Sequence, residues 1–105
     1  MRFWIADELR GAGFAVVEAA DADEAVRVVS GLFPVQLVLT DIQLPGQFDG
    51  AGLAEWLRME RPEIKVIVES ANLRLVNADA LLSKPYSAAE MIRTVQRLLA
   101  QRANG

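Results

Sequence analysis

The sequence contains neither cysteine nor histidine. Without cysteine, the chain has no disulfide and no thiolate that could bind a metal. Without histidine, it has no imidazole for acid–base catalysis and cannot build the common zinc sites. These two absences exclude thiol and imidazole enzymes, disulfide scaffolds and zinc modules.

Positive charge and long apolar runs are also scarce. Eleven Lys and Arg stand against 14 Asp and Glu, for a net charge of −3, which predicts no basic surface for nucleic acid or anionic lipid. No apolar run approaches the ~20 residues of a membrane span, and residues 1–5 are too few for a signal peptide. We therefore expect a soluble, cytoplasmic protein that binds neither nucleic acid nor membrane.

The chain has 105 residues, of which 52% are hydrophobic, so we expect residues 1–105 to form a single domain with a packed core. Apolar or β-rich runs predict strands, and amphipathic stretches with capping residues predict helices. The predicted strands are residues 14–20, 35–40, 65–69 and 80–83, and the predicted helices are 21–32, 51–61 and 87–99. This alternation predicts an α/β fold with an open parallel sheet of about four strands.

Three polar residues stand where predicted strands end: Asp41, Ser70 and Lys84. Ligands of open parallel sheets bind beyond these carboxyl ends. A carboxylate there can attack phosphorus and carry the phosphoryl group as an acyl phosphate. A hydroxyl can hydrogen-bond a phosphoryl oxygen, and an ammonium can neutralise its charge. The three residues together predict a phosphoryl-transfer site.

The same residues stand in motifs that resemble the receiver domain of bacterial two-component response regulators. The motifs are Leu39-Thr-Asp-Ile-Gln-Leu-Pro-Gly46, Asp49-Gly50, Val66-Ile-Val-Glu-Ser70 and Leu82-Ser-Lys-Pro-Tyr86. The resemblance implies a three-layer, flavodoxin-like (CheY-like) fold with sheet order 2-1-3-4-5. It implies a signalling domain in a phosphorelay, not an enzyme, with a histidine kinase or phosphotransfer protein as its partner.

The resemblance also assigns roles to individual residues. Asp41 would be the phosphoacceptor, and the backbone carbonyl of Gln43 would join it as a ligand of Mg²⁺. Ser70 would be the switch hydroxyl, and Lys84 would bridge to the phosphoryl group. The Lys84–Pro85 bond would be cis, which only an X–Pro bond makes cheap.

Two features of a receiver have no counterpart in this sequence: the first strand and the acidic pair that ends it. The only adjacent acidic pair near the start is Asp7-Glu8, and residues 9–13 leave five positions before the strand predicted at Phe14. A parallel crossover needs about 10–12 residues, so we interpret Asp7 and Glu8 as solvated charges on a helix. With one carboxylate left, Mg²⁺ should bind weakly and phosphorylation should be slow.

Glu69 does not replace the missing pair in this interpretation, because strand alternation should point it away from Ser70. Leu81 occupies the position of the family's switch aromatic, and Tyr86 is not assumed to replace it. Residues 71–79 leave room for only a turn or two of helix. Loss of a central strand exposes sheet edges, which predicts self-association into a homo-oligomer.

Two functions remain open from the sequence. The first is a receiver that accepts a phosphoryl group on Asp41. The second is a degenerate, unphosphorylated receiver that serves as an interaction or dimerisation module. A third explanation for the missing strand is a start codon assigned too late, because Met1 falls inside a helical pattern.

Overall fold

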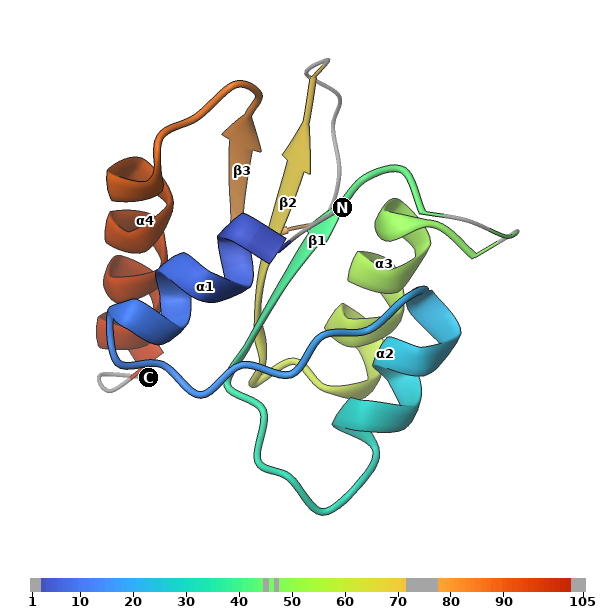
Figure 1. Cartoon of the computed structure of the whole chain (residues 1–105). Coiled ribbons are helices and arrows are strands. Elements are labelled where there is room, and N and C mark those ends of the chain that lie inside the picture. The colour runs from blue at the N-terminus through green and yellow to red at the C-terminus, as the bar shows by residue number, and fades with distance from the viewer. Residues whose placement is uncertain (1–2, 45, 47, 72–77, 103–105) are drawn as a thin grey trace.

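The computed structural model describes residues 3–44, 46, 48–71 and 78–102 (Figure 1). Its elements in chain order are α1 (Phe3–Gly11), α2 (Ala22–Val29), β1 (Leu37–Asp41), α3 (Gly50–Glu60), β2 (Lys65–Ser70), β3 (Ala80–Ser83) and α4 (Ala88–Arg102). The strands are parallel and lie in the order β1-β2-β3. Across the described ranges, no helix has both the length and the apolarity to span a bilayer.

The sheet is the middle of three layers, with α1 and α4 on one face and α2 and α3 on the other (Figure 1). Strand β2 supplies both cores, because alternate residues of a strand point to opposite faces. Val66 and Val68 pack with α2 and α3, whereas Ile67 packs with α1 and α4. The predicted α/β flavodoxin-like class is confirmed.

The strand predicted over residues 14–20 does not form, so the sheet of the described residues has three strands and not about four. Burial nevertheless alternates along this segment: Phe14 and Val16 are half-buried against the α1–α4 core, and Val17 is 60% exposed. A strand needs a hydrogen-bonded neighbour. None of the described residues forms a ladder with this segment, which therefore crosses the domain as a loop (Figure 1).

The helix beginnings follow the predicted capping chemistry. The Asp21 carboxylate accepts a hydrogen bond from the Glu24 backbone N–H at 2.8 Å, and the Ser87 hydroxyl accepts one from the Glu90 N–H at 3.1 Å. Asp49 is the N-cap of α3, and its carboxylate accepts a hydrogen bond from the Gly52 N–H at 2.9 Å. These side chains satisfy N–H groups that a helix start otherwise leaves without a partner.

At the chain's start, α1 confirms the predicted helix: Ile5 and Leu9 are buried, and Asp7 and Glu8 are exposed. At the other end, α4 continues to Arg102, three residues beyond the predicted helix end at residue 99. Residues 103–105 lie outside the described residues. So do residues 72–77, which hold most of the segment for which only a turn or two of helix was predicted.

Candidate functional site

Strand register brings the predicted site residues to one edge of the sheet. Asp41, the last residue of β1, pairs with Glu69 of β2, and Ser70 pairs with Ser83 of β3. Lys84 follows β3 directly, and its backbone N–H donates to the Ser70 carbonyl at 2.9 Å. The carboxyl ends of all three strands therefore meet at one place, as in other open parallel sheets.

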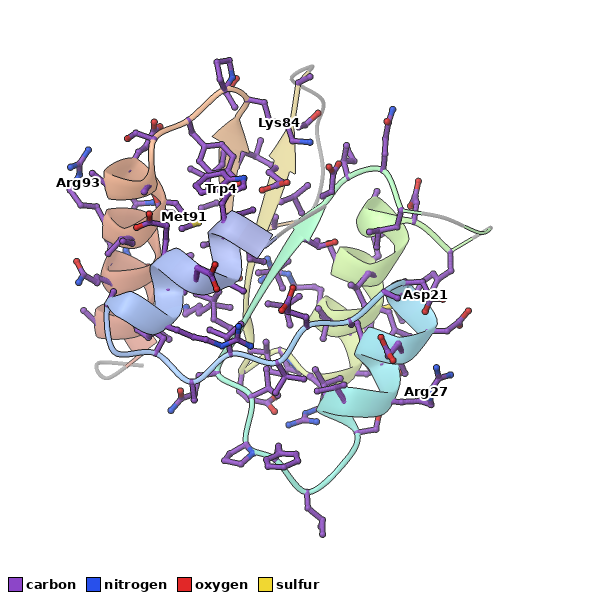
Figure 2. The ribbon with its side chains drawn as sticks, viewed as in Figure 1. Trp4, Asp21, Arg27, Lys84, Met91 and Arg93 are labelled. Atoms are coloured by element: carbon purple, nitrogen blue, oxygen red, sulfur yellow. The ribbon has the colours of Figure 1, made fainter. Side chains whose placement is uncertain are left out.

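Asp41 and Lys84 are in direct contact there. The Lys84 Nζ lies 2.5 Å from the Asp41 Oδ2, and the Gln43 backbone N–H donates to the other oxygen, Oδ1, at 2.9 Å. The side chain of Asp41 is 11% exposed and that of Lys84 is 32% exposed. In Figure 2, Lys84 lies beyond the carboxyl end of the sheet. The Asp41 carboxylate is thus mostly buried, whereas about a third of the Lys84 side chain is accessible to solvent.

Gly50 holds the backbone behind Asp41 in close contact with α3. Its N–H donates to the Ile42 carbonyl at 3.0 Å. A Cβ at this position would lie 1.9 Å from the Asp41 carbonyl oxygen and 2.8 Å from the Ile42 Cα. Only glycine permits this approach. The contact with the start of α3 therefore fixes the position of the Asp41 backbone at the end of β1.

The remaining predicted residues lie nearby in different settings. Ser70 is 9% exposed and stands one position beyond Glu69, so its side chain leaves β2 on the opposite face. Gln43 contacts the Asp41 carboxylate through its backbone N–H. Leu81, at the switch-aromatic position, is 44% exposed. The Lys84–Pro85 bond is cis, as expected.

Sequence reasoning missed Glu69 and Tyr86. Glu69 does leave β2 on the face opposite Ser70, but this is the face that its register partner Asp41 also uses. It is 1% exposed, its Oε1 lies 3.7 Å from the Lys84 Nζ, and its Oε2 accepts a hydrogen bond from the Tyr86 hydroxyl. The Tyr86 ring packs on Trp4 of α1, with ring centroids 5.7 Å apart. A glutamate inside an otherwise apolar buried strand was the available signal, because Glu is rarely buried without a charged partner.

The donor set does not fit a tightly held Mg²⁺. Mg²⁺ is bound by oxygen atoms, usually carboxylate, water and phosphate. Both Asp41 oxygens already accept hydrogen bonds, and the Lys84 ammonium contacts the Asp41 and Glu69 carboxylates. No group of three or more acidic side chains capable of holding a metal occurs within the described ranges. At this edge of the sheet, the positive charge next to the Asp41 carboxylate is therefore that of the Lys84 ammonium.

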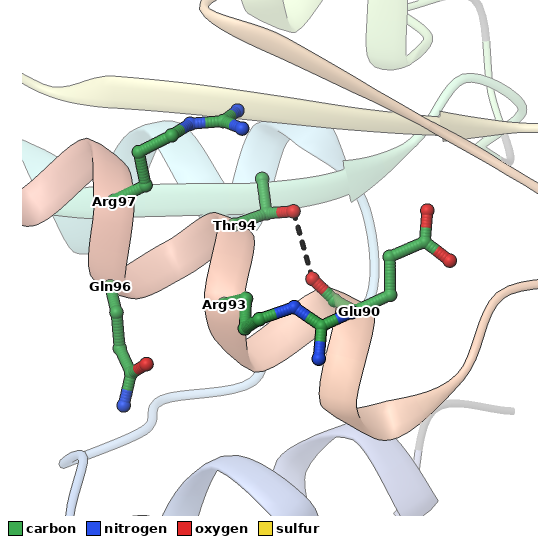
Figure 3. A pocket seen from close by; sticks show the side chains of 5 residues that line it. All are labelled: Glu90, Arg93, Thr94, Gln96 and Arg97. Carbon is green, nitrogen blue, oxygen red and sulfur yellow. Dashed lines mark hydrogen bonds between the residues drawn. The ribbon is translucent and has the colours of Figure 1, made fainter.

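A second surface feature lies on α4, away from the strand ends. This shallow hollow of about 470 Å³ is lined by one helix only (Figure 3). Its lining residues are Glu90, Arg93, Thr94, Gln96 and Arg97. The Thr94 hydroxyl donates to the Glu90 carbonyl at 2.8 Å, and Arg93 and Arg97 are exposed. These arginines form a solvated helix face.

Comparisons with known proteins agree with this geometry. A response regulator receiver protein of Anaeromyxobacter sp. (strain Fw109-5) is 35% identical over 102 residues, which are 93% of this chain and 41% of that protein. The transcriptional regulatory protein PrrA of Mycobacterium tuberculosis is 34% identical over 104 residues, 91% of this chain and 44% of that protein. The chain thus spans less than half the length of these two relatives.

Solved structures show the same fold. A CheY-like response regulator receiver domain protein from Methanospirillum hungatei has a TM-score of 0.88 at 25% identity, over 97% of this chain and 86% of that one. The receiver domain of NtrX from Brucella abortus has a TM-score of 0.82 at 26% identity, over 94% and 89%. The response regulator receiver domain family matches residues 1–96. The chain belongs to the response regulator receiver domain family.

Proposed function

We propose that this receiver domain accepts a phosphoryl group on Asp41 from a histidine kinase or phosphotransfer protein of a two-component phosphorelay. The contact of 2.5 Å between the Lys84 Nζ and the Asp41 Oδ2 carries the proposal. A carboxylate at a strand end can be an ordinary turn residue. This one contacts the Lys84 ammonium, which can neutralise the charge of a phosphoryl oxygen.

The proposed step is a displacement at phosphorus. An Asp41 oxygen attacks the phosphorus of a phosphohistidine, a P–O bond forms, and the P–N bond breaks with its electron pair going to the imidazole. The imidazole then takes a proton from water, and Asp41 carries an acyl phosphate. The phosphoryl group adds negative charge, which the Lys84 ammonium offsets.

Other residues hold the nucleophile for this step. The Gln43 N–H, at 2.9 Å from Oδ1, orients the carboxylate, and Gly50 fixes the backbone beneath it. Ser70 ends the adjacent strand with its side chain on the other face of the sheet, and its hydroxyl is proposed to reach a phosphoryl oxygen beyond the strand ends. Because Mg²⁺ fits poorly, the step relies on the chain's own charge, and we expect it to be slow.

The test is intact-mass analysis after incubation with acetyl phosphate and Mg²⁺. The parent should gain the mass of one phosphoryl group, and hydroxylamine should remove it, because acyl phosphates are cleaved by that nucleophile. Asp41→Asn should show no gain. Asp23→Asn makes the same chemical change at an exposed position of α2 and should behave as the parent.

A gain in the parent that persists in Asp41→Asn would refute the assignment of the phosphoacceptor. Circular dichroism establishes that each variant is folded. No gain in a folded parent, with either acetyl phosphate or a phosphorylated histidine kinase as donor, would refute the proposed function. That result would favour the unphosphorylated interaction module.

A further inference from the structure

We propose that Glu69 restrains Lys84 and thereby weakens the site's affinity for anionic phosphodonors; this inference rests on the proposed function. Glu69 has no role in the chemistry described above. It is a positioning residue, because it acts on the phosphoryl group only through Lys84. Two observations carry the proposal: the charge balance at the strand ends, and the burial and hydrogen bond that hold Glu69 in place.

The first observation is the charge balance at the strand ends. Asp41 and Glu69 are register partners on one face of the sheet, and the Lys84 ammonium contacts both, at 2.5 Å and 3.7 Å. Among the described residues, these two carboxylates and one ammonium sum to a formal charge of −1. An incoming phosphodonor is itself an anion, so it meets one negative charge more than a site with Asp41 and Lys84 alone would present.

The second observation is that Glu69 cannot easily leave. Its side chain is 1% exposed, and its Oε2 accepts a hydrogen bond from the Tyr86 hydroxyl. Tyr86 in turn packs on Trp4 of α1 at 5.7 Å between ring centroids. The carboxylate is therefore fixed from the α1 side of the sheet, whereas Lys84, with 32% of its side chain exposed, is the partner that can move. An incoming phosphoryl group must draw Lys84 from Glu69.

The decisive variant is Glu69→Gln, which keeps the shape and an oxygen that can accept from the Tyr86 hydroxyl. It removes the charge that holds Lys84 and repels the donor. We expect the half-saturating concentration of acetyl phosphate for phosphoryl uptake to fall about tenfold. Structural damage lowers activity, so a gain distinguishes the proposed role from a merely structural one.

Two further variants complete the design. Tyr86→Phe keeps the ring on Trp4 but removes the hydroxyl that donates to Glu69. The Glu69 carboxylate then interacts more strongly with Lys84, so phosphoryl uptake at low acetyl phosphate concentration should fall severalfold. Glu60→Gln makes the same charge change at the exposed carboxyl end of α3. Helix α3 leads into β2, so this end lies at the opposite edge of the sheet, and Glu60→Gln should match the parent.

A readout without phosphorylation keeps this inference separable from the proposed function. Lys65 and Lys84 are the chain's two lysines, so limited acetylation with acetic anhydride and peptide mapping give a clean ratio. An ammonium held in ion pairs must leave them before it reacts, and Glu69→Gln should raise acetylation of Lys84 relative to Lys65 severalfold.

The outcomes divide as follows. If the parent is phosphorylated and Glu69→Gln shows no gain in donor affinity, the inference is overturned while the proposed function stands. If neither protein is phosphorylated, the proposed function is overturned, and the acetylation ratio alone decides whether Glu69 restrains Lys84. An unchanged ratio in Glu69→Gln overturns the restraint in either case.

Discussion

Replacing Gly50 by alanine tests how firmly α3 is seated against the phosphoacceptor. A Cβ at position 50 would stand 1.9 Å from the Asp41 carbonyl oxygen. Ordinary carbon–oxygen contacts begin at about 3.3 Å, so the overlap is about 1.4 Å. The atoms in its way are backbone atoms of Asp41 and Ile42, which cannot rotate aside as a side chain can. Either α3 or the end of β1 must move.

The magnitude follows from two opposing effects. Alanine favours a helix over glycine by up to about 1 kcal/mol, and overpacking costs about 1–3 kcal/mol, occasionally more. Because the overlap is with backbone, we expect the upper part of that range and a net loss of about 2 kcal/mol or more in the free energy of unfolding. For a domain of this size the melting temperature should fall by about 8–16 °C.

Urea unfolding followed by circular dichroism measures the change, with phosphoryl uptake measured on the same samples. Gly11→Ala is the matched control, because a Cβ there meets nothing within 4 Å. That control should be neutral or more stable by up to about 1 kcal/mol. Uptake by Gly50→Ala should drop, since the Asp41 carboxylate would shift relative to Lys84. A Gly50→Ala protein as stable and as active as its parent would refute the reasoning.

Three further outcomes follow from the structure. Lys84→Met should lower the free energy of unfolding by about 1–3 kcal/mol, because the buried Glu69 carboxylate loses its cation; urea unfolding that matches the parent would contradict this. Asp49→Ala removes the α3 N-cap and should cost about 1 kcal/mol, a loss that Asp49→Asn should largely restore. We expect the protein to self-associate at high concentration, because Leu32 is 103% and Phe33 72% exposed and β1 is an edge of the described sheet. Light scattering measures this, and an L32K/F33K double variant should be more monomeric than the parent. A parent that stays monomeric at high concentration would exclude the prediction.

The sequence was most informative where chemistry and local pattern coincide. Strands 65–70 and 80–83 follow from continuous apolar runs, and helix starts follow from capping residues. The meeting of Asp41 with Lys84 could be predicted because strand ends of a parallel sheet share one edge. None of these steps required knowledge of which residues face each other across the sheet.

Register was the missing information for Glu69. Alternation correctly separates it from Ser70, but only the pairing of Asp41 with Glu69 shows that these two carboxylates share a face. The strand predicted at residues 14–20 was wrong for a related reason. Its alternating burial is real, yet a pattern within one segment cannot reveal whether a neighbouring strand exists to pair with it.

Strand β2 has a mechanical consequence for the whole domain. It is the one strand of the described sheet with neighbours on both sides, and its residues from Val66 to Ser70 are all buried. The α1–α4 and α2–α3 layers therefore pack against the same central strand, and we expect them to unfold together. Amide protons along β2 should exchange with solvent only through global unfolding. Glu69 and Ser70 are consecutive residues of β2 with side chains on opposite faces, so a displacement of the backbone at the carboxyl end of β2 would move both side chains.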